Sequence, residues 1–307
     1  MRRPVTLRDF GSYTAGGRLH RVTEGQPRDL PVTRDVTLTF DPRGTFAVEQ
    51  AYVQYFIPDP LRDAPPVVLL HGGGMSGTVW EGTPDGRQGW LQLLLAEGYE
   101  VHVIDNAERG RAGFMPGLWP GEPVLRSLED AWHLFRIGPP DGFAARRAFP
   151  GQRFPADSLP ALAATFAPRW LSTAPQQAAA VKAVLDGLPS PILVAHSQGA
   201  EPAFEAIAQG ARLSQLVLLE PSAEPDDPTP LAGLPVTLFT GDYLDINELW
   251  QGRAAAWDRF EARLRHAGTP LHRLASGTTL PSGHSHLPMH DHGHDTVLDT
   301  ILATLGT

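Results

Sequence analysis

The stretch LVAHSQGAEP, residues 193–202, places Ser197 between an apolar run and a run of small, helix-forming residues. A serine on a sharp turn between a strand and a helix presents its Oγ above the sheet edge, where it can attack a carbonyl carbon. Such a turn brings together the residues two places before and after the serine, so both must be small. Here they are Ala195 and Gly199, in the pattern A-H-S-Q-G. The alternative is that Ser197 only caps the following helix.

A nucleophilic serine needs a histidine base, and the base needs an acid that orients it. The loop SGTTLPSGHSHLPMHDHGH, residues 276–294, holds five of the chain's 12 histidines. We prefer His286 to His284 as the base, because the apolar residues 287–289 follow it like the buried end of a rigid loop. The histidine spacing, with aspartates nearby, leaves a zinc site as the alternative.

The acid has two candidate positions after apolar runs. In LVLLEP, Glu220 directly follows four apolar residues. In LFTGDYLD, Asp242 and Asp245 come after the next apolar run. Burying a carboxylate without a partner is costly, which favours a functional Glu220, whereas Asp242 after a glycine also fits simple turn chemistry. The residues alone leave both positions open.

The glycine loop HGGGMSG after the run VVLL predicts an oxyanion hole. Glycines let the backbone approach a substrate closely, and backbone N–H groups stabilise the charge that develops on a carbonyl oxygen. We expect one donor from Gly73, with Gly72 or Gly74 as alternatives, and the other from Gln198. A phosphate-binding loop is the competing interpretation, but no lysine follows the glycines.

Alternating strand and helix patterns surround these residues. PPVVLLHGGG, EVHVID and SPILVAHS are continuous apolar runs, typical of buried parallel strands, and RQGWLQLLLAEGY and AEPAFEAIAQG have helical spacing. This predicts an α/β chain with a mostly parallel central sheet flanked by helices. The N-terminal runs predict antiparallel strands, with TFAVEQAYVQYFIP at the edge of the sheet.

Residues 114–172 interrupt that alternation. The segment is rich in proline, glycine and aromatic residues, and so much aromatic area is seldom left in water. We therefore expect an inserted cap or lid over the carboxyl edge of the sheet, with residues 1–113 and 173–307 forming the core. A long surface excursion is the alternative. His71, His196 and Trp119 are candidates for the lining of a substrate pocket.

Composition narrows the function classes. The chain has 307 residues, a formal net charge of −9 and no cysteine. The charge argues against a nucleic-acid partner, and the missing cysteine excludes disulfides and thiolate sites. No run predicts a membrane span, and MRRPVTLRDFGSYTAGG lacks the apolar core of a signal peptide. We expect a cytoplasmic location, with a periplasmic or secreted one left open.

With these residues in place, the chain resembles the serine esterases of the α/β-hydrolase superfamily, and more narrowly the bacterial esterase-713-like group. The resemblance lies in LLHGGGMSGTVWEGTPDGRQGWLQLLLAEGYEVHVIDNAERGRAG, AHSQGA, LLEP and GHSHLPMHD, with W-E-x-T-P-D-G-R-x-G-W the most specific part. It implies Glu220 as the acid, His286 as the base, and Gly73 with Gln198 as oxyanion donors. It also implies a homodimer. This chain differs in having no cysteine in the glycine loop and no visible signal peptide.

We therefore expect a cofactor-free serine hydrolase that cleaves small to medium, apolar or aromatic carboxylic esters through an acyl-enzyme. A lactonase, an amidase or a C–C hydrolase could use the same three residues. A metallohydrolase built on the histidine-rich loop and a non-catalytic binding protein are the remaining alternatives. We expect no membrane partner and no bound metal.

Overall fold

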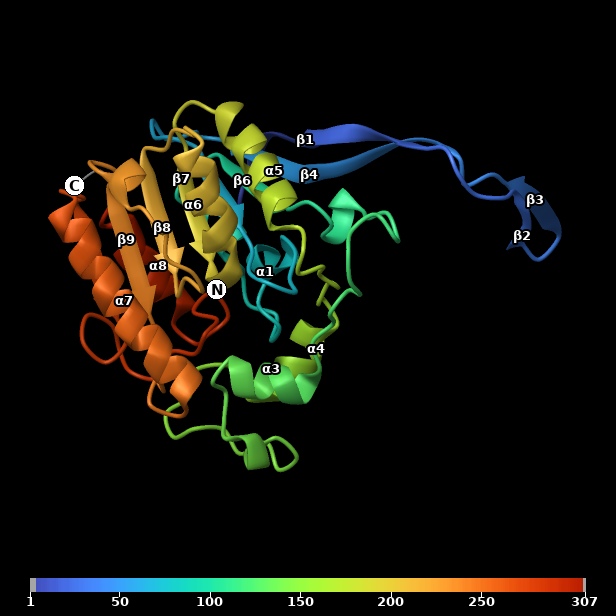
Figure 1. Cartoon of the computed structure of the whole chain (residues 1–307). Coiled ribbons are helices and arrows are strands. Elements are labelled where there is room, and N and C mark those ends of the chain that lie inside the picture. Colours follow the sequence, from blue (N-terminus) through green and yellow to red (C-terminus); the bar gives the residue numbers. More distant parts are fainter. Residues whose placement is uncertain (1–3, 306–307) are drawn as a thin grey trace.

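The computed structural model describes residues 4–305. Its main sheet consists of β1 (Leu7–Val22), β4 (Gly44–Pro58), β5 (Val67–Leu70), β6 (Val101–Asp105), β7 (Ile192–His196), β8 (Gln215–Leu219), β9 (Val236–Thr240) and β10 (Leu271–Ala275). Within the described residues the strand order is β1-β4-β6-β5-β7-β8-β9-β10 (Figure 1). β1, β4 and β6 pair antiparallel, and all neighbours from β6 to β10 pair parallel. The predicted mostly parallel α/β sheet is confirmed.

Helices cover both faces of the sheet. The α-helices are α1 (Thr78–Glu81), α2 (Trp90–Ala96), α3 (Leu128–Leu134), α4 (Leu159–Ala163), α5 (Ala174–Asp186), α6 (Ala200–Ala208), α7 (Glu248–His266) and α8 (His294–Leu302). Short 3₁₀ turns are η1 (Gly110–Ala112), η2 (Pro140–Gly142), η3 (Ala156–Ser158), η4 (Ser197–Gly199) and η5 (Thr229–Leu231). α5, α6 and α7 pack into the hydrophobic cluster on one face, and α1, α2 and α8 into the cluster on the other (Figure 1).

The carboxyl ends of the parallel strands set the place of the chemistry. Every residue of β5, β6, β7, β8 and β9 is buried, as expected for strands covered by helices on both faces. Ser197 directly follows β7, and Glu220 directly follows β8, its neighbour in the sheet. Parallel pairing therefore delivers both side chains to the same edge of the sheet.

The N-terminal strands form a long arm. β1 and β4 run beyond the body of the protein, and the chain between them forms a small second sheet of β2 (Arg28–Thr33) and β3 (Val36–Phe40) (Figure 1). The predicted antiparallel strand β4 is present, but its predicted place at the edge is wrong, because β1 pairs along its outer side. Glycines commonly end a strand, so the sequence did not indicate a long β1. Gly16 and Gly17 have positive φ, yet they lie inside β1.

Residues 114–172 contain α3 and α4 joined by turns, and they pack beside the carboxyl edge of the sheet (Figure 1). Trp132, Phe135 and Leu159 from this segment lie in the same hydrophobic cluster as α2 and α8. Among residues 4–305, no helix combines the length and the apolar character that crossing a bilayer requires.

Candidate active site

Ser197 lies on a strained turn between β7 and α6. Its φ is +51°, in the left-handed region that non-glycine residues seldom occupy. The turn packs tightly, since a Cβ added to Gly199 would lie 2.6 Å from the His71 carbonyl oxygen. The Ser222 N–H donates to the Ser197 carbonyl at 3.0 Å and ties the turn to the chain after β8. This strain is the expected signature of a serine aimed at a substrate rather than of a simple helix cap.

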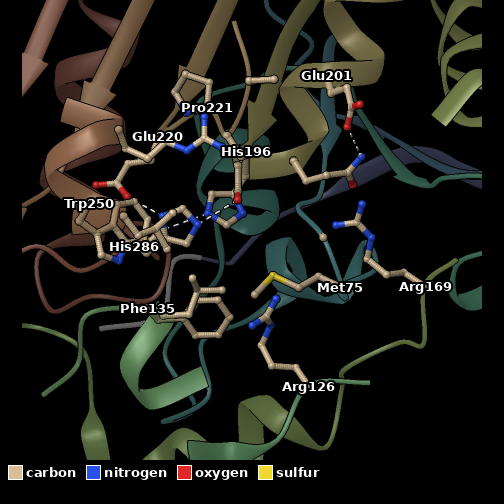
Figure 2. Close-up of a pocket in the computed structure, with 18 residues that line it drawn as sticks. Met75, Arg126, Phe135, Arg169, His196, Glu201, Glu220, Pro221, Trp250 and His286 are labelled. Atoms are coloured by element: carbon tan, nitrogen blue, oxygen red, sulfur yellow. Dashed lines mark hydrogen bonds and ion pairs between the residues drawn. The ribbon is translucent and has the colours of Figure 1, made fainter. Parts of the chain in front are cut away.

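His286 joins Ser197 to Glu220. Its Nε2 lies 2.9 Å from Ser197 Oγ, and its Nδ1 lies 2.5 Å from Glu220 Oε2 (Figure 2). A carboxylate only accepts hydrogen bonds, so Nδ1 carries the proton and Nε2 is free to accept the serine proton. The structure thus brings the three predicted residues into one hydrogen-bonded chain.

Glu220 is buried among four donors. Arg136 binds it with both terminal nitrogens, Nη1 at 2.8 Å from Oε2 and Nη2 close to Oε1. The Gly241 N–H donates to Oε1 at 2.6 Å, and His286 supplies the fourth contact. The Arg136 guanidinium also stacks over the Trp250 ring, with 4.0 Å between its central carbon and the ring centroid. The carboxylate is therefore held rigidly on the side away from the histidine.

Burial and charge oppose each other at this site. Burial raises the pKa of Glu220, but the charge of Arg136 and the hydrogen bond with His286 outweigh it and leave the pKa at about 2. Burial, together with the charges of Arg136 and Arg126, lowers the pKa of His286 below its ordinary value although the Glu220 carboxylate raises it. At neutral pH the acid is ionised and the imidazole is neutral, which is the state a general base requires.

The alternative residues take other roles. Asp242 accepts hydrogen bonds from Ser276 Oγ at 2.7 Å and from the Gly283 N–H, so it braces the histidine-rich loop. Asp245 is exposed. His284 is buried with its Nδ1 3.1 Å from Asp291 Oδ2. None of these three side chains forms a hydrogen bond with Ser197 or His286 in the part of the chain that the structure describes.

The glycine loop lies against the serine turn. A Cβ on Gly73 would lie 2.5 Å from Arg169 Nη1 and 3.3 Å from Gln198 Cβ, so a larger residue here would have to displace the Arg169 side chain. The Gln198 side chain is held in turn, because its Nε2 donates to Gln177 Oε1 at 3.2 Å. Gln177 Nε2 donates to Glu108 Oε1 at 2.9 Å. Within residues 4–305, the backbone N–H groups of Gly73 and Gln198 have no hydrogen-bond partner.

A pocket of about 390 Å³ opens above Ser197 (Figure 2). Its lining is partly apolar, from Met75, Leu134, Phe135, Pro221, Leu249 and Trp250, and partly charged. His196 is one of the lining residues, as expected, and its Nε2–H donates to the His286 carbonyl at 2.9 Å. Rings of Phe135, His196 and Trp250 lie within 5.9 Å of the His286 ring, centroid to centroid, and restrict its motion.

Two expected pocket residues lie elsewhere. Trp119 packs on the Trp170 ring and donates from Nε1 to Glu49 Oε1 at 3.1 Å, outside this pocket. His71 lies beneath the glycine loop, where its Nε2 accepts from the Asn106 N–H at 3.1 Å. Trp119 was misjudged because aromatic content marks a segment as buried without saying which side it faces. His71 uses both ring nitrogens to shape the backbone.

In the described structure, the histidines of the loop 276–294 are not grouped as metal ligands. Across residues 4–305, no group of three histidine or carboxylate side chains is arranged to hold a metal ion. His290 and His294 are buried, and burial lowers the pKa of His290 to about 3 and that of His294 to about 4. These histidines therefore belong to the packing beneath the loop rather than to a solvated surface.

Arg136 and Trp250 are parts of the site that sequence reasoning missed. Arg136 is 84 residues before Glu220, and it follows α3 in the segment 114–172. The available signal was an arginine inside the apolar run HLFRIG, where a lone charge needs a buried partner. Trp250 is fixed by the start of α7, where Asn247 Oδ1 accepts from the Trp250 N–H at 3.0 Å.

The parallel sheet, the strand–serine–helix turn and the order serine, acid, histidine define an α/β-hydrolase fold. No family model matches the chain. By sequence it is 35% identical over 101 residues to a probable secreted lipase of a fungal species, a match covering 33% of this chain and 27% of that protein. By structure, a bacterial esterase solved at atomic resolution matches with a TM-score of 0.85 and 30% identity, covering 99% of this chain and 97% of that one.

The chain therefore belongs to the family of that bacterial esterase, within the α/β-hydrolase superfamily. This confirms the resemblance drawn from the glycine loop and the serine motif. Membership makes the protein an enzyme, a hydrolase of the carboxylic ester type.

Proposed function

We propose that the protein hydrolyses carboxylic esters through an acyl-enzyme on Ser197. His286 removes the Ser197 proton as Oγ attacks the ester carbonyl carbon, and the oxyanion binds the amides of Gly73 and Gln198. The alcohol leaves with the proton from His286. Water, activated by the same imidazole, then cleaves the acyl-enzyme and releases the acid. Glu220 holds the imidazole in the required tautomer and stabilises its charged form.

One observation carries this proposal: a continuous contact from Ser197 Oγ through both nitrogens of His286 to Glu220, at 2.9 and 2.5 Å. Geometry of this kind allows each proton transfer without rearrangement of the base. The partly apolar lining suits small to medium apolar or aromatic esters.

The test is hydrolysis of p-nitrophenyl acetate, butyrate and octanoate by the wild type, Ser197→Ala and Ser222→Ala, each with and without EDTA. We expect Ser197→Ala to lose roughly 10³-fold or more in kcat. Ser222 is a matched control, because it lines the same pocket but its only hydrogen bond to the serine turn comes from its backbone. A fluorophosphonate should form a bond from phosphorus to Ser197 Oγ with loss of fluoride, so that the peptide containing Ser197 gains the mass of the reagent less HF.

Activity that survives Ser197→Ala would reject the serine mechanism, and activity lost in EDTA would point to a metallohydrolase. Faster turnover of lactones, amides or β-diketones than of matched esters would keep the acyl-enzyme or its C–C counterpart but change the substrate class. No turnover of any of these with an intact fold would favour a binding protein.

Residues 114–172 complete the proposed site, and we propose that they act as a cap. Arg126, Leu134, Phe135 and Arg169 of this segment line the pocket, and Arg136 binds the proposed triad acid. Specificity would then reside largely in this segment, whereas the proposed reacting groups come from the sheet edge.

We also propose a homodimer, as the resemblance implies. The arm exposes apolar side chains on both of its small strands: Val32, Val36, Leu38 and Phe40. A second copy would remove these side chains from water. Light scattering after size-exclusion chromatography should give twice the mass of one chain, and Leu38→Glu should reduce it.

A further inference from the structure

Three arginines line the pocket of an otherwise acidic protein. The chain carries a formal net charge of −9, yet Arg126, Arg169 and Arg253 line the pocket that contains the proposed nucleophile. Two carboxylates also line the pocket, Glu220 and Glu201. Glu220 is already bound by Arg136 and His286, so it offers no charge to the pocket arginines.

Arg169 is held directly beside the glycine loop. Its Nη1 would lie 2.5 Å from a Cβ at Gly73, which places the guanidinium against the proposed oxyanion donor (Figure 2). Two backbone contacts fix it there: the Arg169 N–H and carbonyl pair with Val124, and the Ala167 N–H donates to the Gly74 carbonyl at 2.9 Å. The fold therefore fixes the backbone of Arg169 next to the glycine loop, within reach of which its guanidinium lies.

The guanidinium of Arg169 has no hydrogen-bond or ion-pair partner among the described residues. Its Nε is buried without a hydrogen bond, and no side chain of residues 4–305 forms a hydrogen bond or ion pair with its terminal nitrogens. Glu201 and Glu108 interact with it only through longer-range charge, and burial lowers the Arg169 pKa. Arg169 as a whole is half-buried, but a guanidinium nitrogen shielded from water without a partner is costly unless a ligand supplies one.

The other two arginines extend the positive charge across the pocket. Arg126 lies on the side of Met75 and Phe135 (Figure 2). It also forms an ion pair with the exposed Asp130. Arg253 lies on α7 and interacts with Glu224 only through longer-range charge. A substrate bound to Ser197 would thus meet guanidinium groups on more than one side.

We propose that the preferred substrates are esters that carry a free carboxylate, with Arg169 as the residue that binds it. This inference rests on the proposed ester hydrolysis at Ser197. The planar guanidinium can donate two parallel N–H bonds to a carboxylate, and such charge-assisted pairs are stronger than neutral hydrogen bonds. The carboxylate also takes the partner position that no residue of the described chain fills.

The experiment compares esters that differ only in the carboxylate. Methyl hydrogen glutarate is paired with methyl 5-methylhexanoate for an acyl-side charge, and carboxymethyl butyrate with isobutyl butyrate for an alcohol-side charge. For at least one pair we expect the anionic ester to have a kcat/KM about 10- to 100-fold higher than its neutral isostere. The preference should weaken as salt is added.

Arg169→Gln should abolish that preference by raising KM for the anionic ester far more than KM for its neutral isostere. Arg34→Gln is the matched control, because it removes the same charge from an exposed position on the distant arm. Its charge preference should match that of the wild type.

Two results would overturn the inference. One is equal or better hydrolysis of both neutral esters by the wild type. The other is an equal fall in kcat for neutral and anionic esters in Arg169→Gln, which would assign the guanidinium to the reacting carbonyl. In both cases hydrolysis abolished by Ser197→Ala would leave the proposed function intact, so the two failures are distinguishable.

Discussion

Two histidines that lie two residues apart on the same loop each pair with a buried carboxylate. His286 pairs with Glu220 at 2.5 Å, and His284 pairs with Asp291 at 3.1 Å. All four side chains are buried. Among the described residues, only the first pair contacts the proposed nucleophile, because the remaining nitrogen of His286 lies 2.9 Å from Ser197 Oγ.

The acids of the two pairs have different neighbours. Glu220 is bound by the Arg136 guanidinium, whereas Asp291 accepts from the backbone and the hydroxyl of Ser285, both at 2.7 Å. The Glu220 carboxylate is thus connected to the segment 114–172, whereas the Asp291 carboxylate, among the described residues, accepts hydrogen bonds from its own loop alone. A histidine beside a carboxylate is thus not itself a base, and what its second nitrogen faces decides its role.

Replacing each histidine in turn should separate the two pairs most strongly. We expect His286→Ala to lower kcat by roughly 10³-fold or more, because no other base contacts Ser197. His284→Ala should keep wild-type kcat and instead lower the free energy of unfolding. Steady-state kinetics and urea unfolding of both variants test this. Equal losses of kcat would mean that both histidines serve the reaction.

Removing Arg136 should destabilise the ionised Glu220 and so weaken its contact with His286. Arg136→Met leaves the buried Glu220 charge without its cation, which should cost about 3–5 kcal/mol of stability. Because the Arg136 charge lowers the pKa of His286, the acid limb of the kcat/KM profile should also move to higher pH. Arg136→Lys should restore part of the stability. An unchanged pH profile would limit Arg136 to a structural role.

Lowering the pH should weaken the contact between Glu220 and His286 by protonating Glu220. The pKa of Glu220 lies at about 2 in the folded protein against an ordinary 4.5, so its ionisation stabilises the fold above pH 4.5. That contribution, about 3 kcal/mol, is lost as pH falls from 4.5 toward 2. The stability difference between wild type and Glu220→Gln should shrink by about 2 kcal/mol between pH 6 and pH 3. A constant difference in urea unfolding would contradict this.

The smallest effect should come from the second pair. Ser285→Ala removes the hydroxyl that donates to Asp291 and accepts from the Leu287 N–H at 3.0 Å. We expect a loss of about 2 kcal/mol in stability, since the hydrogen bond to the Asp291 carboxylate and the one from the Leu287 N–H are both removed. The kcat should not change, and a large fall would show that the second pair controls the position of His286.

The sequence predicted the sheet from its continuous apolar runs. It predicted Ser197 and Glu220 because each directly follows such a strand, where local patterns are strong. Ser197 and Glu220 each follow a continuous apolar run, and parallel pairing brings them together. Arg136 and Trp250 could not be located in this way, because their positions depend on contacts between distant segments. The prediction that Trp119 lines the pocket was wrong because its place depends on its contacts with Glu49 and Trp170, which the local sequence does not indicate.

The packing of residues 114–172 has a consequence for how the enzyme can change. Trp132, Phe135 and Leu159 share one hydrophobic cluster with the helices α2 and α8. This segment is therefore not an exchangeable module, because excising it would expose the interior of the catalytic body to water. Calorimetry should record a single cooperative transition for both parts. New specificities are more accessible through single replacements at the pocket wall than through grafting a segment from a relative.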